Sequence, residues 1–270
     1  MAGPGPEATG GRSPTGPTRW ALRCHGVTQL GGRTTQQDAL VAAGLVALAP
    51  GARLDSALTL APEAKVLFAV VDGMGGQAGG EAAAGVVATE LARLDPTSVE
   101  DWTPVLEAIS DRVGQAGQAW AAPDMGATVA LLVVGRDQAV VANVGDSRCH
   151  QVADGYVSQI SVDDRDTLAG DNVVTQSLGG DPRALDAHQF AVPHSDGPST
   201  RYLLCSDGLH GVVPHDVLRS VLVEPRPPKD VVALLDGLAR LSATDNYSIL
   251  VVDVVRSAAD GPSSAHREGG

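Results

Sequence analysis

One stretch of the chain, residues 65–77, places the strongest constraint on the fold. Its apolar half contains three valines and a phenylalanine, a composition typical of a fully buried β-strand. The run stops at Asp72, and glycines occupy three of the next four positions. Such a strand end brings a carboxylate to a turn where the backbone can approach a ligand closely. The pattern also fits a plain strand–turn–helix connection, because Asp-Gly is a common turn dipeptide.

Composition excludes several classes of protein. The 270 residues are 43% hydrophobic and carry a formal net charge of −13. Nucleic acids and anionic membrane surfaces bind clusters of Lys and Arg, so we expect neither as a partner. No apolar run is long enough to span a membrane, and the N-terminus lacks the apolar core of a signal peptide. The three cysteines are far apart in the sequence, without a Cys-x-x-Cys pair, which favours small core residues in a reducing compartment. We therefore expect a cytoplasmic protein.

The two ends of the chain differ in composition from its middle. Residues 1–17 and 257–270 are rich in Gly, Pro, Ser and Thr and contain few apolar residues. Such segments bury too little surface to offset the entropy of ordering, so both are predicted to be disordered tails. The folded domain is predicted to span residues 18–256.

Hydrophobic patterns within this domain predict strands that are mostly arranged as hairpins, with helices in pairs. The strands are expected at residues 20–28, 39–43, 66–71, 127–134, 138–144, 147–153, 156–161, 173–178, 201–206 and 247–254. The helices are expected at 79–93, 104–121, 215–223 and 229–241, with Thr103 as the N-cap of the second. Residues 45–64 mix Pro, Gly and apolar residues and are predicted to form a long loop. This order indicates an α+β layered fold without alternating βαβ units.

Four aspartates share one position relative to the predicted strands. Asp72 and Asp207 each end a strand, whereas Asp38 and Asp245 each precede one. If they meet at one sheet edge, mutual repulsion would raise their pKa values unless a cation neutralises them. A site of oxygen ligands without His or Cys selects hard cations such as Mg²⁺ or Mn²⁺. A single Asp at a strand end is more often only a turn residue, and spacing alone does not bring the four together.

Seven short motifs occur in the chain in a characteristic order. They are Arg33 through Gln37-Asp38, Val71-Asp72-Gly73-Met74-Gly75-Gly76, Gly126-Ala127-Thr128, Val144-Gly145-Asp146-Ser147-Arg148, Leu178-Gly179-Gly180, Cys205-Ser206-Asp207-Gly208-Leu209, and Asp245-Asn246-Tyr247-Ser248. In this order the sequence resembles the metal-dependent serine/threonine protein phosphatases of type 2C, the PPM family, over nearly all of residues 18–256. The resemblance implies a four-layer αββα sandwich, in which two central antiparallel sheets are flanked by helix pairs.

The resemblance also implies a metal site at one end of the sandwich. Asp72 would bridge two Mg²⁺ or Mn²⁺ ions, and the Gly73 carbonyl would bind one of them. Asp207 and Asp245 would complete the coordination of the other ion. Asp38 would hold metal-bound waters.

Two further residues are assigned by the same resemblance. Asp146 matches an acidic position that helps Asp207 to hold a weaker third ion in several members. Arg33 would bind the substrate phosphate, a role that suits the planar two-pronged guanidinium. Two neighbouring cations can lower the pKa of a shared water and direct it at phosphorus, so no side-chain nucleophile is needed.

Two departures from the family pattern affect the predicted mechanism. Many eukaryotic members have a histidine after the Asp-Gly pair as the proposed proton donor, but this chain has Met74, as many bacterial members do. His210 is the nearest histidine in motif terms, and a surface loop residue is its more common role. The segment between Ser161 and Leu178 is short and acidic where members commonly have a longer flap. The sequence therefore predicts the two-ion site, but neither the preferred substrate nor whether a third ion binds.

The leading hypothesis is a monomeric phosphatase of phosphoserine and phosphothreonine in proteins, acting on the products of a serine/threonine kinase. A catalytically silent member that binds partners is one alternative, although the presence of Asp38, Asp72, Asp207 and Asp245 favours activity. A metal-dependent hydrolase of small phosphate esters is the other alternative, because its chemistry would be the same.

Overall fold

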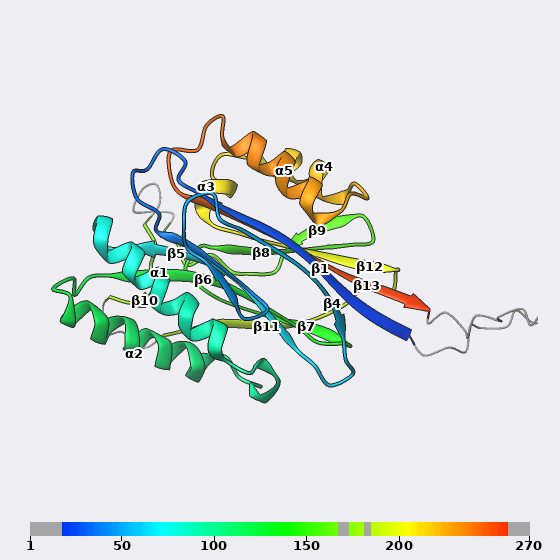
Figure 1. Cartoon of the computed structure of the whole chain (residues 1–270), viewed down its shortest axis with the longest axis horizontal. Helices are drawn as coiled ribbons and strands as arrows, with labels where there is room; N and C mark the ends of the chain where they lie inside the picture. Colours follow the sequence, from blue (N-terminus) through cyan, green and yellow to red (C-terminus); the bar gives the residue numbers. More distant parts are fainter. Residues whose placement is uncertain (1–17, 167–172, 181–184, 259–270) are drawn as a thin grey trace, which may run out of the picture.

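The computed structural model describes residues 18–166, 173–180 and 185–258. In this part of the chain two antiparallel sheets stack face to face and helices cover both outer faces (Figure 1). The predicted four-layer αββα sandwich is therefore confirmed. The predicted tails lie almost wholly outside the described residues, except that the last strand continues to Ala258.

The first sheet has six strands. In spatial order they are β4 (Arg53–Leu60), β1 (Thr18–Gln29), β13 (Tyr247–Ala258), β12 (Ser199–Cys205), β8 (Arg148–Ala153) and β9 (Tyr156–Gln159). The second sheet has seven strands. They are β11 (His188–Pro193), β7 (Gln138–Val144), β6 (Gly126–Val134), β5 (Val66–Met74), β2 (Asp38–Ala42) and β3 (Leu45–Ala47), with β10 (Leu178–Gly179) paired to β6.

Helices form the two outer layers. Helices α1 (Gly76–Arg93) and α2 (Thr103–Ala119) pack on the seven-stranded sheet, with a 3₁₀ turn, η1 (Pro96–Ser98), between them. Helices α4 (His215–Val223) and α5 (Pro228–Ala239) pack on the six-stranded sheet together with the short α3 (Asp207–His210). No helix in the described ranges has both the length and the apolar character to cross a membrane.

Strand β5 shows how the sequence produces the layers. Leu67, Ala69 and Val71 are buried against the helix layer, whereas Phe68 and Val70 are buried between the sheets. Because side chains alternate along a strand, an apolar run without polar interruptions fits a strand that is covered on both faces. Asp72 continues the inward series of Phe68 and Val70, so its position in the strand directs its side chain to the space between the sheets.

Strand β2 has the same alternation and pairs with β5 in register. Asp38 lies directly opposite Asp72 in this pair, and Leu40 lies opposite Val70. Ala39 packs outward, against the helix side of the sheet, and Leu40 packs inward, between the sheets. The register therefore sets the two aspartates side by side at one end of the inter-sheet core.

Several predicted elements differ from the structure. The predicted loop at 45–64 contains β3 and β4, and the predicted strand at 173–178 is reduced to an isolated bridge at Val174 and the two-residue β10. Strand β11 was not predicted. Strands β3, β4 and β11 lie at sheet edges with much of their surface exposed, so their apolar patterns are weak.

The predicted N-cap of the second helix is also wrong. Trp102 occupies the N-cap position of α2, and Thr103 is already its first residue. The backbone N–H of Thr103 donates to Asp101 Oδ1 at 3.0 Å. The side chain of Asp101 thus satisfies a free N–H at this helix start, the function expected of a capping side chain.

Candidate active site

A cavity of about 330 Å³ opens at the end of the sandwich where β2, β5 and α3 meet. Six of the seven predicted site residues line it, and the seventh, Asp38, lies opposite Asp72. The lining residues are Arg33, Thr34, Thr35, Gln37, Asp72, Gly73, Met74, Gly75, Gly76, Thr128, Asp146, Val174, Asp207 and Asp245. Residues from six of the seven motifs therefore meet in one place.

Asp38, which is buried, and Asp72, which is half-buried, form the centre of this site. Asp38 is 1% exposed, and its Oδ2 accepts a hydrogen bond from Ser206 Oγ at 2.7 Å. Its Oδ1 is buried and has no hydrogen-bond partner among the described residues. Burial raises the pKa of Asp38 to about 7 and, together with the charge of Asp38, raises the pKa of Asp72 well above its usual value. An unpaired buried oxygen beside a second carboxylate is an arrangement that a cation would stabilise.

A chain of hydroxyl groups supports Asp38 from below. Ser206 Oγ, which donates to Asp38, accepts from the backbone N–H of Ser248 at 2.9 Å. The hydroxyls of Ser248 and Thr28 are hydrogen-bonded at 2.8 Å, and Gln36 Nε2 donates to the Thr28 hydroxyl. All these groups are buried. The sequence analysis placed Ser206 and Ser248 in motifs but assigned them no role, because their contacts join β12, β13 and β1.

Gly73 makes a close backbone contact with helix α1. A Cβ atom built on Gly73 would lie 2.0 Å from the carbonyl oxygen of Gly80, and one built on Gly80 would lie 2.7 Å from the carbonyl oxygen of Gly73. The N–H of Gly73 donates to the Gln37 carbonyl at 3.0 Å. Helix α1 can therefore approach the predicted metal-binding carbonyl only because both positions are glycine. Gly80 was missed by the sequence analysis.

Arg33 and Asp245 form an ion pair in the lining of the cavity. Arg33 Nη2 donates to Asp245 Oδ2 at 2.6 Å, and the Arg33 side chain is 51% exposed. Asn246 positions the loop that carries Arg33, because its Nδ2 donates to Leu30 O and its Oδ1 accepts from Gln37 N, both at 2.9 Å. An exposed ion pair is weak, so the guanidinium can turn to another anion at little cost.

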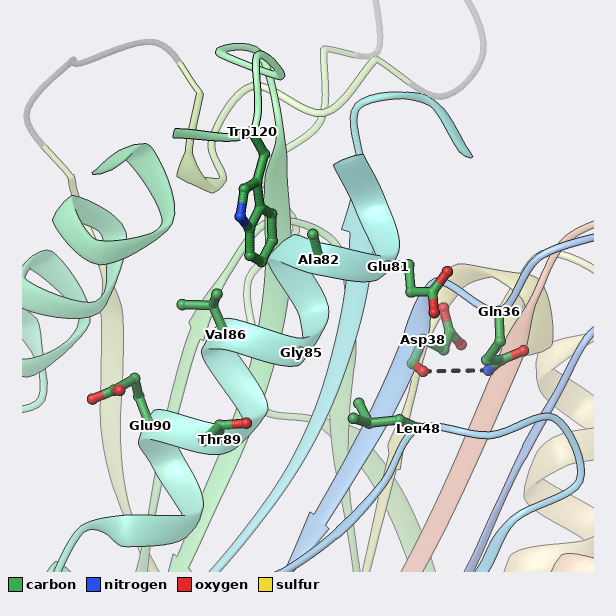
Figure 2. Close-up of a pocket in the computed structure, with 10 residues that line it drawn as sticks. All are labelled: Gln36, Asp38, Leu48, Glu81, Ala82, Gly85, Val86, Thr89, Glu90 and Trp120. Carbon is green, nitrogen blue, oxygen red and sulfur yellow. Dashed lines mark hydrogen bonds between the residues drawn. The ribbon is translucent and has the colours of Figure 1, made fainter. Parts of the chain in front are cut away.

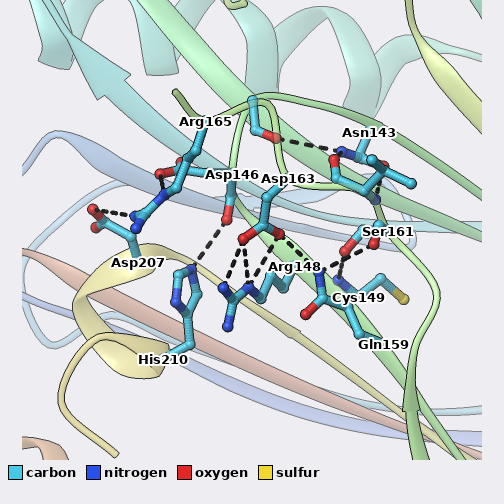
Figure 3. Close-up of polar contacts among 12 residues, drawn as sticks. Asn143, Asp146, Arg148, Cys149, Gln159, Ser161, Asp163, Arg165, Asp207 and His210 are labelled. Carbon is cyan, nitrogen blue, oxygen red and sulfur yellow. Dashed lines mark hydrogen bonds and ion pairs between the residues drawn. The ribbon is translucent and has the colours of Figure 1, made fainter. Parts of the chain in front are cut away.

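Asp207 and Asp146 complete the acidic wall, and both contact Arg165. Arg165 Nε donates to Asp146 Oδ2 at 2.6 Å, and Arg165 Nη2 lies 3.5 Å from Asp207 Oδ2 (Figure 3). Burial and the charges of Asp146 and Asp245 raise the pKa of Asp207. Arg165 lies in the short acidic segment that departs from the family pattern, and the motifs assign it no role.

Comparison with known proteins then identifies the family. The sequence model of the family described as protein phosphatase 2C matches residues 52–265. The chain belongs to the protein phosphatase 2C family. The matched range begins after Arg33 and Asp38, so these two residues are placed in the site by the geometry alone.

Bacterial serine/threonine phosphatases are among its relatives. Protein phosphatase PstP of Mycobacterium tuberculosis is 31% identical over 209 residues, which cover 70% of this chain and 40% of PstP. The Listeria monocytogenes phosphatase stp is 26% identical over 211 residues, which cover 68% of this chain and 82% of stp. The chain thus spans less than half of the length of PstP.

Solved structures agree with this assignment. PppA, described as a key regulatory component of T6SS in Pseudomonas aeruginosa, has a TM-score of 0.70 and 28% identity, with coverage of 86% of this chain and 96% of PppA. The catalytic domain of PstP in complex with 2 manganese ions has a TM-score of 0.67 and 25% identity, with coverage of 87% of this chain and 99% of that domain.

The donor set of this phosphatase-family site fits hard divalent cations. Asp38, Asp72, Asp207 and Asp245 offer carboxylate oxygens, Gly73 offers a carbonyl, and one buried Asp38 oxygen has no partner in the described part of the chain. Within the described ranges, however, no three Asp, Glu, His or Cys side chains are arranged as a ready metal cage. An ion bound here would therefore depend on waters for part of its coordination, as Mg²⁺ commonly does.

A second cavity of about 560 Å³ lies over the exposed face of α1 (Figure 2). Figure 2 shows Trp120 at one end of it and Leu48 at the other, and these side chains are 59% and 44% exposed. Gln36 and Asp38 also line this cavity, so it adjoins the acidic site. Its walls are mainly apolar, and none of the described residues that line it is an arginine. The smaller acidic cavity is therefore the candidate active site.

Proposed function

We propose that this chain is a metal-dependent phosphatase that hydrolyses phosphoserine and phosphothreonine in proteins. The observation that carries the proposal is the in-register pair of Asp38, which is buried, and Asp72, which is half-buried; Asp38 has an oxygen without a partner in the described residues. Two such groups are costly to bury as anions unless a cation compensates them. Membership of the protein phosphatase 2C family supports the same conclusion.

We assign two Mg²⁺ or Mn²⁺ ions to the site. Asp72 would bridge them. The Gly73 carbonyl would help to hold one ion, and Asp207 with Asp245 would hold the other. Asp38 would orient bound waters. Ions held here would supply a nucleophilic water of lowered pKa and neutralise charge on the phosphoryl group. That the catalytic domain of PstP was solved with 2 manganese ions is in keeping with this assignment.

Arg33 would bind the phosphate of the substrate. Its guanidinium lines the cavity and, within the described part of the chain, its ion pair is the exposed contact with Asp245. A phosphate monoester offers two oxygens to the guanidinium, which is a stronger and more directional contact than an exposed ion pair. Arg33 would therefore exchange part of its contact with Asp245 for the substrate and align the phosphorus in the cavity.

The proton for the leaving alkoxide does not come from a histidine in this proposal. Met74 lines the cavity at the position where many eukaryotic members of the family have a histidine, and it has no proton to give. His210 is half-buried, its Nε2 lies 3.0 Å from the Asp146 carbonyl oxygen, and desolvation lowers its pKa to about 3. His210 is therefore neutral near pH 7, and we assign proton delivery to solvent water in the open cavity.

Phosphoproteins made by a serine/threonine kinase are the proposed substrates, and the cytoplasm is the proposed location. The names of PstP and stp as serine/threonine phosphatases support the substrate class. Cys24, Cys149 and Cys205 are free and buried, which is in keeping with a reducing compartment. The monomeric state stays a prediction.

Hydrolysis of p-nitrophenyl phosphate and of a phosphothreonine peptide by the full chain tests the proposal. We expect activity with Mn²⁺, no activity with EDTA, and a loss of about a thousandfold in Asp72→Asn, which corresponds to about 4 kcal/mol of barrier. Asp253→Asn is the matched control, because Asp253 pairs with Arg201 away from the cavity and its loss leaves the site intact.

A wild type as inactive as Asp72→Asn would contradict the enzyme proposal and favour the silent alternative. A higher kcat/KM for small phosphate esters than for the phosphothreonine peptide would favour the other alternative. Circular dichroism of each variant separates loss of activity from loss of fold.

A further inference from the structure

We propose that Arg165 is a built-in cation that takes the place of a third metal ion between Asp146 and Asp207, so that the chain binds two ions and no more. The inference rests on the proposed two-ion function. Arg165 is not among the residues that line the cavity, but its side chain contacts Asp146, which is.

The contacts of Arg165 are those of a bridging cation. Its Nε donates to Asp146 Oδ2 at 2.6 Å, and its Nη2 lies 3.5 Å from Asp207 Oδ2 (Figure 3). One guanidinium thus contacts a carboxylate oxygen of each aspartate. An ion bound to the same two oxygens would need the guanidinium to leave.

Burial makes this arrangement difficult to displace. The side chain of Asp146 is 2% exposed, and that of Arg165 is 22% exposed. A carboxylate so far removed from water requires a positive partner, and breaking a buried pair costs more than breaking a surface pair. A divalent ion would have to supply that cost in addition to its own dehydration. Arg165 therefore lowers the affinity of this position for any metal ion.

Contacts of the two preceding residues and a backbone bridge to Val174 hold the segment of Arg165 in place. Asp163 before it forms a two-pronged pair with Arg148, with contacts of 3.0 and 2.6 Å. Asp164 Oδ2 accepts from the Gly145 N–H at 2.8 Å, and Arg165 itself forms an antiparallel bridge with Val174. Because its neighbours are fixed, little conformational freedom is lost when the guanidinium reaches Asp146.

A purely structural ion pair is the competing explanation. In that case the removal of Arg165 would lower stability and leave the number of bound ions unchanged. Arg148 offers a matched comparison, because it is a second arginine of the same network whose side chain pairs with Asp163 instead of Asp146 or Asp207. Loss of Arg148 should destabilise the segment without opening a metal site.

The experiment is a Mn²⁺ titration of the full chain, followed by the loss of the free Mn²⁺ signal in electron paramagnetic resonance and by calorimetry. Wild type and Arg148→Gln are expected to bind two ions, and Arg165→Gln to bind three. The third ion of Arg165→Gln should bind at least about tenfold more tightly than any ion that the wild type takes up beyond its first two, a difference of about 1.4 kcal/mol. Adding Asp146→Asn to Arg165→Gln should return the count to two.

Two results would overturn the inference. One is a wild type that binds three ions and loses one of them in Asp146→Asn. The other is a folded Arg165→Gln that still binds two ions with unchanged affinity. Should Arg165→Gln not fold, Asp146→Asn alone decides the question, because we expect its ion count to equal that of wild type. Absence of any Mn²⁺ binding in wild type would instead contradict the proposed function itself.

Discussion

The contact between Gly73 and Gly80 leads to a prediction that compares two glycines of helix α1. A Cβ on Gly80 would lie 2.7 Å from the Gly73 carbonyl oxygen and 2.3 Å from Gln37 Nε2. A Cβ on Gly85, one and a half turns later, would meet no atom within 4 Å. Gly80→Ala and Gly85→Ala add the same methyl group to the same helix, so their difference isolates the contact with the site.

The structure sets the expected magnitudes. Carbon needs about 3.5 Å from its neighbours, so in Gly80→Ala the carbonyl of Gly73 or the helix must move by about 0.8 Å. Overpacking of this kind costs roughly 1–3 kcal/mol, of which better helix propensity returns up to about 1 kcal/mol. Gly85→Ala has only the propensity gain. We expect its unfolding free energy to rise by about 0.5–1 kcal/mol and its Tm by about 1–4 °C.

Activity should separate the two variants further. A shift of about 1 Å in a positioned group can cost on the order of a hundredfold in rate, and the Gly73 carbonyl is a proposed ion ligand. Gly80→Ala should therefore lose most Mn²⁺-dependent hydrolysis of p-nitrophenyl phosphate, whereas Gly85→Ala should keep it. The assays are kcat/KM and thermal unfolding by circular dichroism. Equal stability and equal activity in the two variants would refute this account of the glycine contact.

Two further predictions concern buried polar groups. Burial lowers the pKa of His150 from 6.5 to about 4, so the unfolded chain takes up a proton that the folded chain does not as the pH falls through this window. The unfolding free energy should therefore fall by up to about 3 kcal/mol as the pH is lowered through this window. Urea unfolding at a series of pH values should show a shallower pH dependence of the unfolding free energy in His150→Leu than in the wild type. The same pH dependence in both proteins would contradict this role of His150. Ser206→Ala removes the hydroxyl that donates to Asp38. We expect its unfolding free energy to fall by about 1–3 kcal/mol and its Mn²⁺ binding, measured by calorimetry, to weaken. Unaltered binding would show that Asp38 needs no such support.

The sequence predicted the parts of the fold that have strong local patterns. Strand β5 was recognisable because both of its faces are buried, and α1 and α2 because glycines and a proline mark their limits. Strands β4 and β11 were missed because each lies at a sheet edge and exposes much of its surface. The pairing that stabilises such a strand is with a distant segment, and local composition does not report it.

In the candidate site, too, the local patterns were predictable from the sequence and the contacts between distant segments were not. Asp72 was a candidate because a buried strand that ends in Asp-Gly is a local pattern, whereas the predicted role of Gly73 came from the resemblance to the family. The support of Asp38 by Ser206 was not found, because these residues are 168 positions apart in the sequence. The pair of Arg165 with Asp146 crosses 19 positions and joins an acidic segment to the end of β7. Such contacts depend on the packing of the two sheets, which motifs do not describe.

The most direct test of the central claim is the number of Mn²⁺ ions bound by the wild type and by Asp72→Asn. Because Asp72 is the proposed bridge between both ions, we expect two ions per chain in the wild type and the loss of both tight sites in Asp72→Asn. Asp253→Asn, which changes a carboxylate outside the cavity, should bind two ions as the wild type does. If Asp72→Asn binds as many ions as the wild type, with the same affinity, Asp72 is not the centre of a metal site and the account is wrong.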